Sequence, residues 1–230
     1  MKKWHILVII VVIILIIIGG LYLFLNMHDS KIIGFNSAGH VTKITYSHYG
    51  NPDNKIAIIT GMHPRESLHD SVLPEVAKLY AIFNNVEIVI YQVTVLDNPT
   101  DFTISRNNGE TLAHDFVVKD ISKEDFDLVI IGHDHEEGYG EGFYIATPSM
   151  DNASVLLAEK VMLKLPDFNY YKRNTTKEPK SNSIKRVNNP IVATGTPVFV
   201  YEIPEWLSFK EAFVKSYDLI DASFKVLRNK

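Results

Sequence analysis

The chain has 230 residues, of which 23 are Lys or Arg and 27 are Asp or Glu, so its formal net charge is -4. With 46% hydrophobic residues it is too apolar to be disordered, and without a basic excess it is not expected to bind nucleic acid. The absence of cysteine excludes disulfides, thiolate metal sites and cysteine nucleophiles. A metal in this chain would need histidine and carboxylate ligands.

The first element is an uncharged apolar run at residues 6–25. At about 1.5 Å per residue, a helix of this length crosses the roughly 30 Å hydrocarbon core of a bilayer. The run is longer than the apolar region of about 7–15 residues in a secretory signal, and residues 23–27 make a poor cleavage site. We therefore predict a transmembrane signal anchor at residues 1–28, which contacts the lipid bilayer through residues 6–25.

Charges beside this run narrowly favour one orientation. Lys2 and Lys3 precede it, whereas Asp29, Lys31 and Lys43 follow it. By the positive-inside rule, the protein is predicted to cross the cell membrane once, with its globular part on the outer face.

Residues 29–230 contain no repeat and no low-complexity run, which predicts a single domain. Stretches rich in β-branched residues predict strands, several of them apolar on both faces, at 55–60, 86–93, 127–131 and 197–202. Helical periodicity marks 68–83, 151–164 and a C-terminal helix from Phe209, which Ser208 and Glu211 begin as a capping box. This alternation predicts an α/β fold with a mixed, largely parallel central sheet flanked by helices, and ligands beyond the carboxyl ends of the strands.

Two finer expectations concern packing. In the helix at 68–83, the spacing predicts a buried face made of Leu68, Val72, Val76, Leu79 and Phe83. The region from about 170 to 189 is polar and without a clear period, so it is predicted to be a long surface loop that borders the site.

Residues of the kind that bind metals follow two of the predicted strands. His63 and Glu66 come after 55–60, and His133 comes after 127–131. Two imidazoles and one carboxylate are a common ligand set for catalytic zinc, whose fourth position is left to water. His63 and Glu66 are three residues apart where a strand turns into a helix, a spacing that brings both to one side. His133 is the predicted third ligand, with His135 or Asp134 as the alternatives.

A third strand end carries a predicted general base. Glu202 closes the apolar strand at 197–202, where burial would raise its carboxyl pKa toward that of a useful base for an activated water. Each of these residues also has a purely structural interpretation. His63 could be a turn histidine, Glu66 a glutamate favoured by the helix dipole, and Glu202 a charge at the rim of the sheet.

Taken in chain order, these motifs resemble those of the zinc metallocarboxypeptidase family, and the resemblance covers about residues 33 to 205. Residues 33–37, 49–50 and 56–66 look like the opening of that family, including His63-Pro64-Arg65-Glu66. Residues 98–99 and 106–109 resemble the stretch whose arginine polarises the scissile carbonyl. Residues 128–133 and 200–204 resemble the strands that carry the third zinc ligand and the catalytic glutamate.

The resemblance implies roles for five residues. One Zn²⁺ per chain would be held by His63, Glu66 and His133, Arg106 would stabilise the oxyanion, and Glu202 would transfer the proton. The implied function is a membrane-anchored zinc hydrolase that cleaves an amide bond of a peptide. One alternative is the deacylation of an N-acyl amino acid, as in the succinylglutamate desuccinylase and aspartoacylase branch of the family. The other is a non-catalytic surface domain that binds a ligand.

One feature of the family is missing. Carboxypeptidases clamp the terminal carboxylate of the substrate with an Asn-Arg pair, and this chain has Ala113 and His114 at that place. Neither side chain offers the planar fork that binds a carboxylate in bidentate fashion. Arg65, His114 and His135 remain as candidates for substrate contact. A tyrosine that covers the substrate has four candidates: Tyr139, Tyr144, Tyr170 and Tyr171.

Overall fold

A computed structural model describes residues 3–176 and 181–229. Residues 1–2 and 230, and residues 177–180 of the predicted polar loop, lie outside the described residues, so Lys2 of the charge argument is among those not described.

Within the described residues, one eight-stranded sheet runs in the order β1-β2-β4-β3-β5-β8-β6-β7. The four predicted strands are its neighbouring central ones and run parallel to one another, whereas β2 and β6 flank them antiparallel. The prediction of a mixed sheet flanked by helices is therefore confirmed. The strands are β1 (Asp29–Asn36), β2 (Gly39–Tyr46), β3 (Lys55–Thr60), β4 (Glu87–Val95), β5 (Leu128–His135), β6 (Tyr144–Ala146), β7 (Asn169–Tyr171) and β8 (Val198–Pro204).

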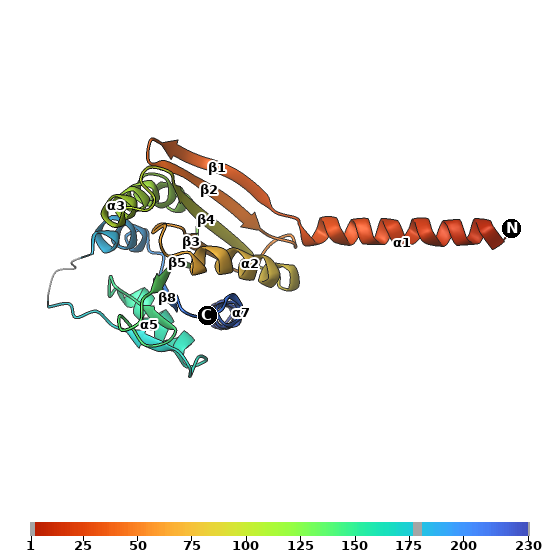
Figure 1. Cartoon of the computed structure of the whole chain (residues 1–230). Helices are drawn as coiled ribbons and strands as arrows, with labels where there is room; N and C mark the ends of the chain where they lie inside the picture. The colour runs from red at the N-terminus through yellow and green to blue at the C-terminus, as the bar shows by residue number, and fades with distance from the viewer. Residues whose placement is uncertain (1–2, 177–180, 230) are drawn as a thin grey trace.

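Helices cover both faces of this sheet (Figure 1). One core cluster joins the sheet to α2, α5 and α7, and the other joins it to α3, η1, α4, η2 and α6. Both faces of the central strands are therefore buried, as their double-sided apolar pattern predicts. The helices are α1 (Lys3–Leu25), α2 (Leu68–Phe83), α3 (Phe102–Leu112), α4 (Lys119–Ile121), α5 (Asn152–Met162), α6 (Asn189–Val192) and α7 (Phe209–Leu227), and two segments of π-helical geometry are η1 (Ala113–Val118) and η2 (Ile184–Asn188).

The predicted buried face of α2 is wrong in part. Val72 and Val76 are fully buried, but Leu79 and Phe83 are 37% and 71% exposed. Tyr80 is buried in their place and stacks on Phe224 of α7, with ring centroids 5.2 Å apart. Because α2 packs on the sheet and on α7 at once, its contact face is rotated from the face that periodicity alone suggested.

The predicted loop at 170–189 is also wrong in part. Its start belongs to β7, and its end forms η2 and continues into α6. Val187 and Ile191, which are four residues apart, are fully buried against the sheet. Among the Lys, Asn and Pro residues of this stretch, two apolar side chains are enough to dock a short helical segment.

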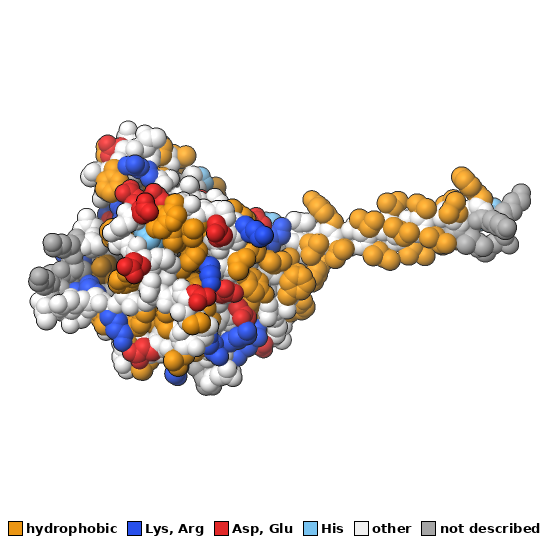
Figure 2. All heavy atoms as spheres, turned by 60° about the horizontal axis from the view of Figure 1, so that its bottom comes forward, with side chains coloured by type: hydrophobic (Ala, Val, Ile, Leu, Met, Phe, Trp, Pro, Cys, Tyr) orange, Lys and Arg blue, Asp and Glu red, His pale blue; other side chains and the backbone are white. Residues whose placement is uncertain are grey.

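The helix α1 projects from the sheet as a single apolar rod (Figures 1 and 2). Its stretch Leu7–Leu25 is long and apolar enough to cross a membrane, and none of it is buried inside the protein. Phe24 contacts the rings of His48 and Tyr49, and Lys78 Nζ donates to Asn26 Oδ1 over 3.0 Å.

These contacts place the end of α1 at one edge of the sheet. His48 and Tyr49 follow the last residue of β2, Tyr46, which pairs with Ile88 near the start of β4. The helix α1 therefore meets the globular part at the amino ends of the parallel strands.

Candidate metal site and cleft

His63 and Glu66 lie in the turn between β3 and α2. The backbone N–H of Glu66 donates to the carbonyl of His63 over 2.9 Å, which closes the turn before α2 begins at Leu68. Gly61 enters the turn with φ +70°, and a Cβ there would lie 2.2 Å from the carbonyl oxygen of Val93. A turn ahead of the helix therefore brings His63 and Glu66 together, whereas the sequence predicted that a turn of the helix itself would do so.

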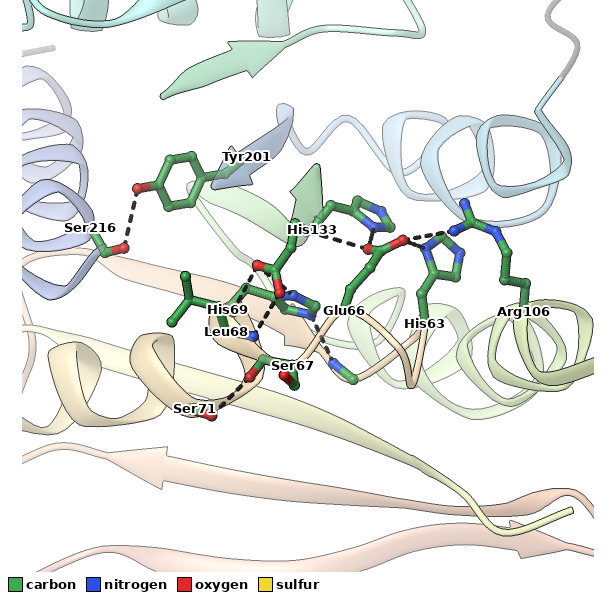
Figure 3. A network of polar contacts seen from close by, with 12 residues as sticks. His63, Glu66, Ser67, Leu68, His69, Ser71, Arg106, His133, Tyr201 and Ser216 are labelled. Atoms are coloured by element: carbon green, nitrogen blue, oxygen red, sulfur yellow. Dashed lines mark hydrogen bonds and ion pairs between the residues drawn. The ribbon is translucent and has the colours of Figure 1, made fainter. Parts of the chain in front are cut away.

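Three side chains converge at the carboxyl-end side of the sheet, two from the turn after β3 and one, His133, from the last residues of β5 (Figure 3). The Nδ1 atom of His63 lies 3.0 Å from Glu66 Oε1, and the Nδ1 atom of His133 lies 2.7 Å from Glu66 Oε2. One ligand atom from each of these residues lies within 4.8 Å of the others. Two imidazoles and a carboxylate facing one point form a donor set that fits a divalent ion.

Neighbouring side chains keep the carboxyl group of Glu66 negatively charged. Burial alone would raise its pKa, but His133 and His63 outweigh burial and hold the pKa of Glu66 far below its usual range. Arg106 adds an ion pair, with its guanidinium 2.7 Å from Oε1. Glu66 is therefore ionised at neutral pH, as a ligand carboxylate must be.

The far side of His63 faces a second carboxylate. Its Nε2 atom is buried, has no hydrogen-bond partner among the described residues, and lies 3.7 Å from Glu110 Oε1 of α3. A metal-bound imidazole usually donates its other ring N–H to such a group, which fixes the ring. Sequence reasoning missed Glu110, because an acidic residue inside a polar helix has no motif to mark it.

Asp134 faces away from this cluster. Its carboxylate accepts from the backbone N–H groups of Leu68 and His69, over 2.6 and 2.8 Å, and so caps the start of α2. His69 Nδ1 lies 3.2 Å from the same carboxylate. The alternative in which Asp134 replaces His133 beside Glu66 is not the arrangement in this structure.

His135 lines the cleft, but its ring is engaged elsewhere. Nδ1 lies 3.2 Å from the carbonyl of Glu136 and Nε2 lies 2.9 Å from the carbonyl of Gly142. The ring is held between Tyr144 and Trp206, with centroids 5.2 and 5.3 Å away. These contacts indicate that His135 fixes the two ends of the segment at residues 136–142.

Glu202 lies beside His133. The two residues are register partners in the parallel strands β8 and β5, so their side chains lie on the same face of neighbouring strands that are about 4.8 Å apart. The carboxylate of Glu202 has no hydrogen-bond partner among the described residues. Burial and the charge of Glu66 raise its pKa to about 7, against the opposing effect of His133. A carboxylate with this pKa is suited to accept a proton at neutral pH.

The three converging side chains and Glu202 line one cleft of about 920 Å³. We call His63, Glu66, His133 and Glu202 the floor of this cleft, and the exposed residues Glu136, Glu137, Tyr139 and Glu205 its rim. The cleft is also lined by Arg65, Phe102, Ser105, Arg106, Asp134, His135, Gly138, Tyr144, Ala146, Pro148, Tyr171, Ser181, Ser183, Ile184, Asn188 and Val200.

Two of the candidate residues, His114 and Tyr170, do not line the cleft, and neither does Ala113, which stands where the family has its carboxylate clamp. His114 is 43% exposed at its side chain, lies 2.9 Å from Asp115, and does not line the cleft. Ala113, the first residue of η1, is buried in the core. The hydroxyl of Tyr170 is paired with Thr147 at 2.8 Å, which leaves Tyr139, Tyr144 and Tyr171 as tyrosines of the cleft.

The fold is carboxypeptidase-like. The chain superposes on a metallo-carboxypeptidase from Burkholderia cenocepacia with a TM-score of 0.66 at 14% identity, covering 91% of this chain and 67% of that one. A metallo-carboxypeptidase from Pseudomonas aeruginosa, in complex with (2-guanidinoethylmercapto)succinic acid, gives 0.59 at 11% identity, covering 91% and 68%. Tripeptide-bound Csd4, a cell shape determinant protein from Helicobacter pylori, gives 0.51 at 11% identity, covering 80% and 55%.

The chain thus spans about two thirds of the length of these carboxypeptidases. No family model matches the sequence, and a search of curated proteins gave no match. At such low identity the structural likeness establishes the fold alone, and any function has to be inferred from this chain's own residues.

Proposed function

We propose that this protein is a zinc-dependent hydrolase that cleaves an amide bond of a peptide. The observation that carries the proposal is the convergence of His63, Glu66 and His133 on one point, with Glu202 in register beside them. When bound there, zinc supplies Lewis-acid chemistry, since it polarises a carbonyl oxygen and acidifies water at neutral pH.

Two residues of the chain perform the remaining steps. Glu202 accepts the proton of the attacking water and delivers it to the leaving nitrogen, a dual role that suits a carboxyl group with its pKa raised to about 7. Arg106 lines the same cleft and donates to the oxyanion of the tetrahedral intermediate. The hydrolysis needs no nucleophilic side chain and no covalent intermediate.

Peptides fit this cleft better than small N-acyl amino acids. A volume of about 920 Å³ is at the upper end of the range for small-ligand pockets and accommodates several residues of an extended chain. A tripeptide is bound in one of the similar structures and a succinic acid derivative in another. We therefore assign peptide hydrolysis as the activity and deacylation of N-acyl amino acids as the second candidate.

We also propose that α1 anchors the protein in a membrane, with the globular part on the outer face. The proposal is supported by the length of Leu7–Leu25, its apolar surface on all sides and its complete lack of burial. By its place at the amino terminus, the same helix is also compatible with a signal sequence. Extraction of the protein from intact membranes at high pH separates the two, because a spanning helix resists such extraction.

The activity is tested on the full chain in detergent micelles. Elemental mass spectrometry should find about one zinc per chain. Release of new amino groups from a peptide pool should require zinc and stop when the zinc is chelated. Tightly bound zinc with no cleavage of peptides or N-acyl amino acids would instead identify a binding domain.

A further inference from the structure

Two almost fully buried polar side chains that line the cleft, Ser105 and Asn188, carry no hydrogen bond among the described residues. Ser105 and Asn188 are each 1% exposed, and Ser105 Oγ and Asn188 Nδ2 have no partner among the described residues. Buried polar atoms are almost always paired, since an unpaired one gives up its bonds to water without compensation. Because both residues line the cleft, a ligand bound there can supply the missing partners.

The two side chains come from elements that are fixed to each other. Ser105 lies in α3, and Asn188 is the last residue of η2. Arg186 of η2 bridges them, since its guanidinium donates to Asn107 Oδ1 over 3.2 Å and to Thr111 Oγ1 over 3.0 Å. The two unpaired groups are therefore held by the fold in a fixed relation on one wall of the cleft.

The charge of this wall is positive. The guanidinium groups of Arg65 and Arg106 lie 5.7 and 5.2 Å from the centre of the Phe102 ring, and all three residues line the cleft. Arg106 pairs with Glu66, whereas Arg65 has no ion-pair partner among the described residues. The ligand group that belongs beside these cations is an anion.

The opposite side of the cleft is acidic. The helix α3 follows β4 on one side of β3, whereas the rim residues Glu136, Glu137 and Glu205 follow β5 and β8 on the other side. A negative group of a ligand is therefore attracted toward α3 and repelled by the rim.

We propose that Ser105 and Asn188 bind a carboxylate of the substrate. A hydroxyl and an amide N–H each donate to one carboxylate oxygen, and Arg65, which has no ion-pair partner among the described residues, supplies the charge. This subsite performs from α3 and η2 the task for which Ala113 and His114 have no suitable side chains. The inference rests on the proposed function for the reaction, but the binding itself can be measured without turnover.

The test uses the full chain in detergent, loaded with zinc and carrying Glu202→Gln to stop turnover. The probes are a pool of N-acetyl dipeptides with a free carboxylate and a matched pool of carboxamides. Binding is measured by equilibrium dialysis with detection by mass spectrometry. Asn188→Asp keeps the shape of the side chain and replaces the donor by a negative oxygen, and Ser105→Ala removes the other donor. Asn189→Asp is the matched control, because Asn189 is the next residue and does not line the cleft.

We expect Asn188→Asp to weaken binding of the free acids about 10- to 100-fold and Ser105→Ala about 10-fold, with little change for the carboxamides. Asn189→Asp should bind both pools as the parent does. The inference is overturned if the parent does not prefer acids to carboxamides, or if acids bind equally well to the parent and to Asn188→Asp with unchanged melting temperature. Should Asn188→Asp fail to fold, Ser105→Ala decides by the same criterion.

The outcome is separable from that of the proposed function. Selective loss of acid binding in Asn188→Asp supports the subsite even if the chain with Glu202 intact cleaves no peptide. Zinc-dependent cleavage combined with equal binding of acids and carboxamides supports the hydrolase and overturns the subsite.

Discussion

The floor and the rim of the cleft are built in opposite ways. Floor residues such as His133 and Glu202 lie at the ends of buried strands, and Glu66 is bound from three sides. The rim residues Glu136, Glu137 and Tyr139 are exposed and lie on a segment that bends at positive φ through Gly138. Rim charges are screened by solvent, whereas floor charges act at close range with little water between them. Changes in the floor should therefore abolish metal binding or chemistry, and changes in the rim should shift affinity.

The largest effect is expected from a floor ligand. His63→Ala should remove the tightly bound zinc, because two ligands hold a divalent ion far less well than three, and activity should disappear with the metal. Zinc content of the purified full chain measures this. His114→Ala is the matched control, since His114 is exposed and does not line the cleft. Equal zinc in both variants would mean that His63 is no ligand.

The next largest effect separates chemistry from metal binding. Glu202→Gln should lower kcat by about 10²- to 10⁴-fold while zinc content stays the same, because the amide keeps the shape but cannot accept the proton. The rim variant Glu205→Gln should change KM by only a few-fold. Turnover of Glu202→Gln at the wild-type rate would exclude Glu202 as the base.

Arg106→Ala should lower kcat about 10²- to 10³-fold, which is the usual cost of losing an oxyanion donor. Arg65→Ala serves as the comparison on the same wall, and its effect should fall on KM. If both variants change only KM, Arg106 contributes to binding and has no role in the transition state.

A smaller effect is expected behind the floor. Glu110→Gln should weaken zinc affinity about 10- to 100-fold, because the carboxylate that faces His63 Nε2 orients that ring. Competition with a chelator of known affinity measures the loss. Glu87→Gln is the control, since Glu87 pairs with Lys55 at the start of β4, away from the cleft. Equal affinities in the two variants would leave Glu110 without an orienting role.

The smallest effect concerns stability. Because burial raises the pKa of Glu202 from 4.5 to about 7, the folded metal-free protein keeps a proton that the unfolded chain releases between these values. Stability is therefore highest below pH 4.5 for this group and falls as the pH rises to 7. Compared with Glu202→Gln, metal-free wild type should lose about 1–3 kcal/mol between pH 5 and pH 8 in urea unfolding. A difference that does not change with pH would contradict the raised pKa.

The position of a site residue, at a strand end or within a helical segment, explains whether the sequence predicts it. His63, His133 and Glu202 follow apolar runs that are plain in the sequence, and the carboxyl ends of parallel strands meet at one edge. Ser105, Glu110 and Asn188 lie in α3 and η2, where no motif in the sequence marks them as site residues. Their importance comes from burial and missing partners, which only the tertiary structure shows.

The position of α1 has a consequence for the proposed membrane anchor. The helix α1 meets the sheet at the amino ends of the parallel strands, and the cleft opens at their carboxyl ends. Strand β4 alone has nine residues, so about 30 Å of protein separates the two. If α1 spans a membrane as proposed, the cleft lies one domain's thickness above the lipid surface. The proposed hydrolase would then reach peptides attached to a polymer at that height, whereas bonds among the lipid headgroups would lie outside its reach.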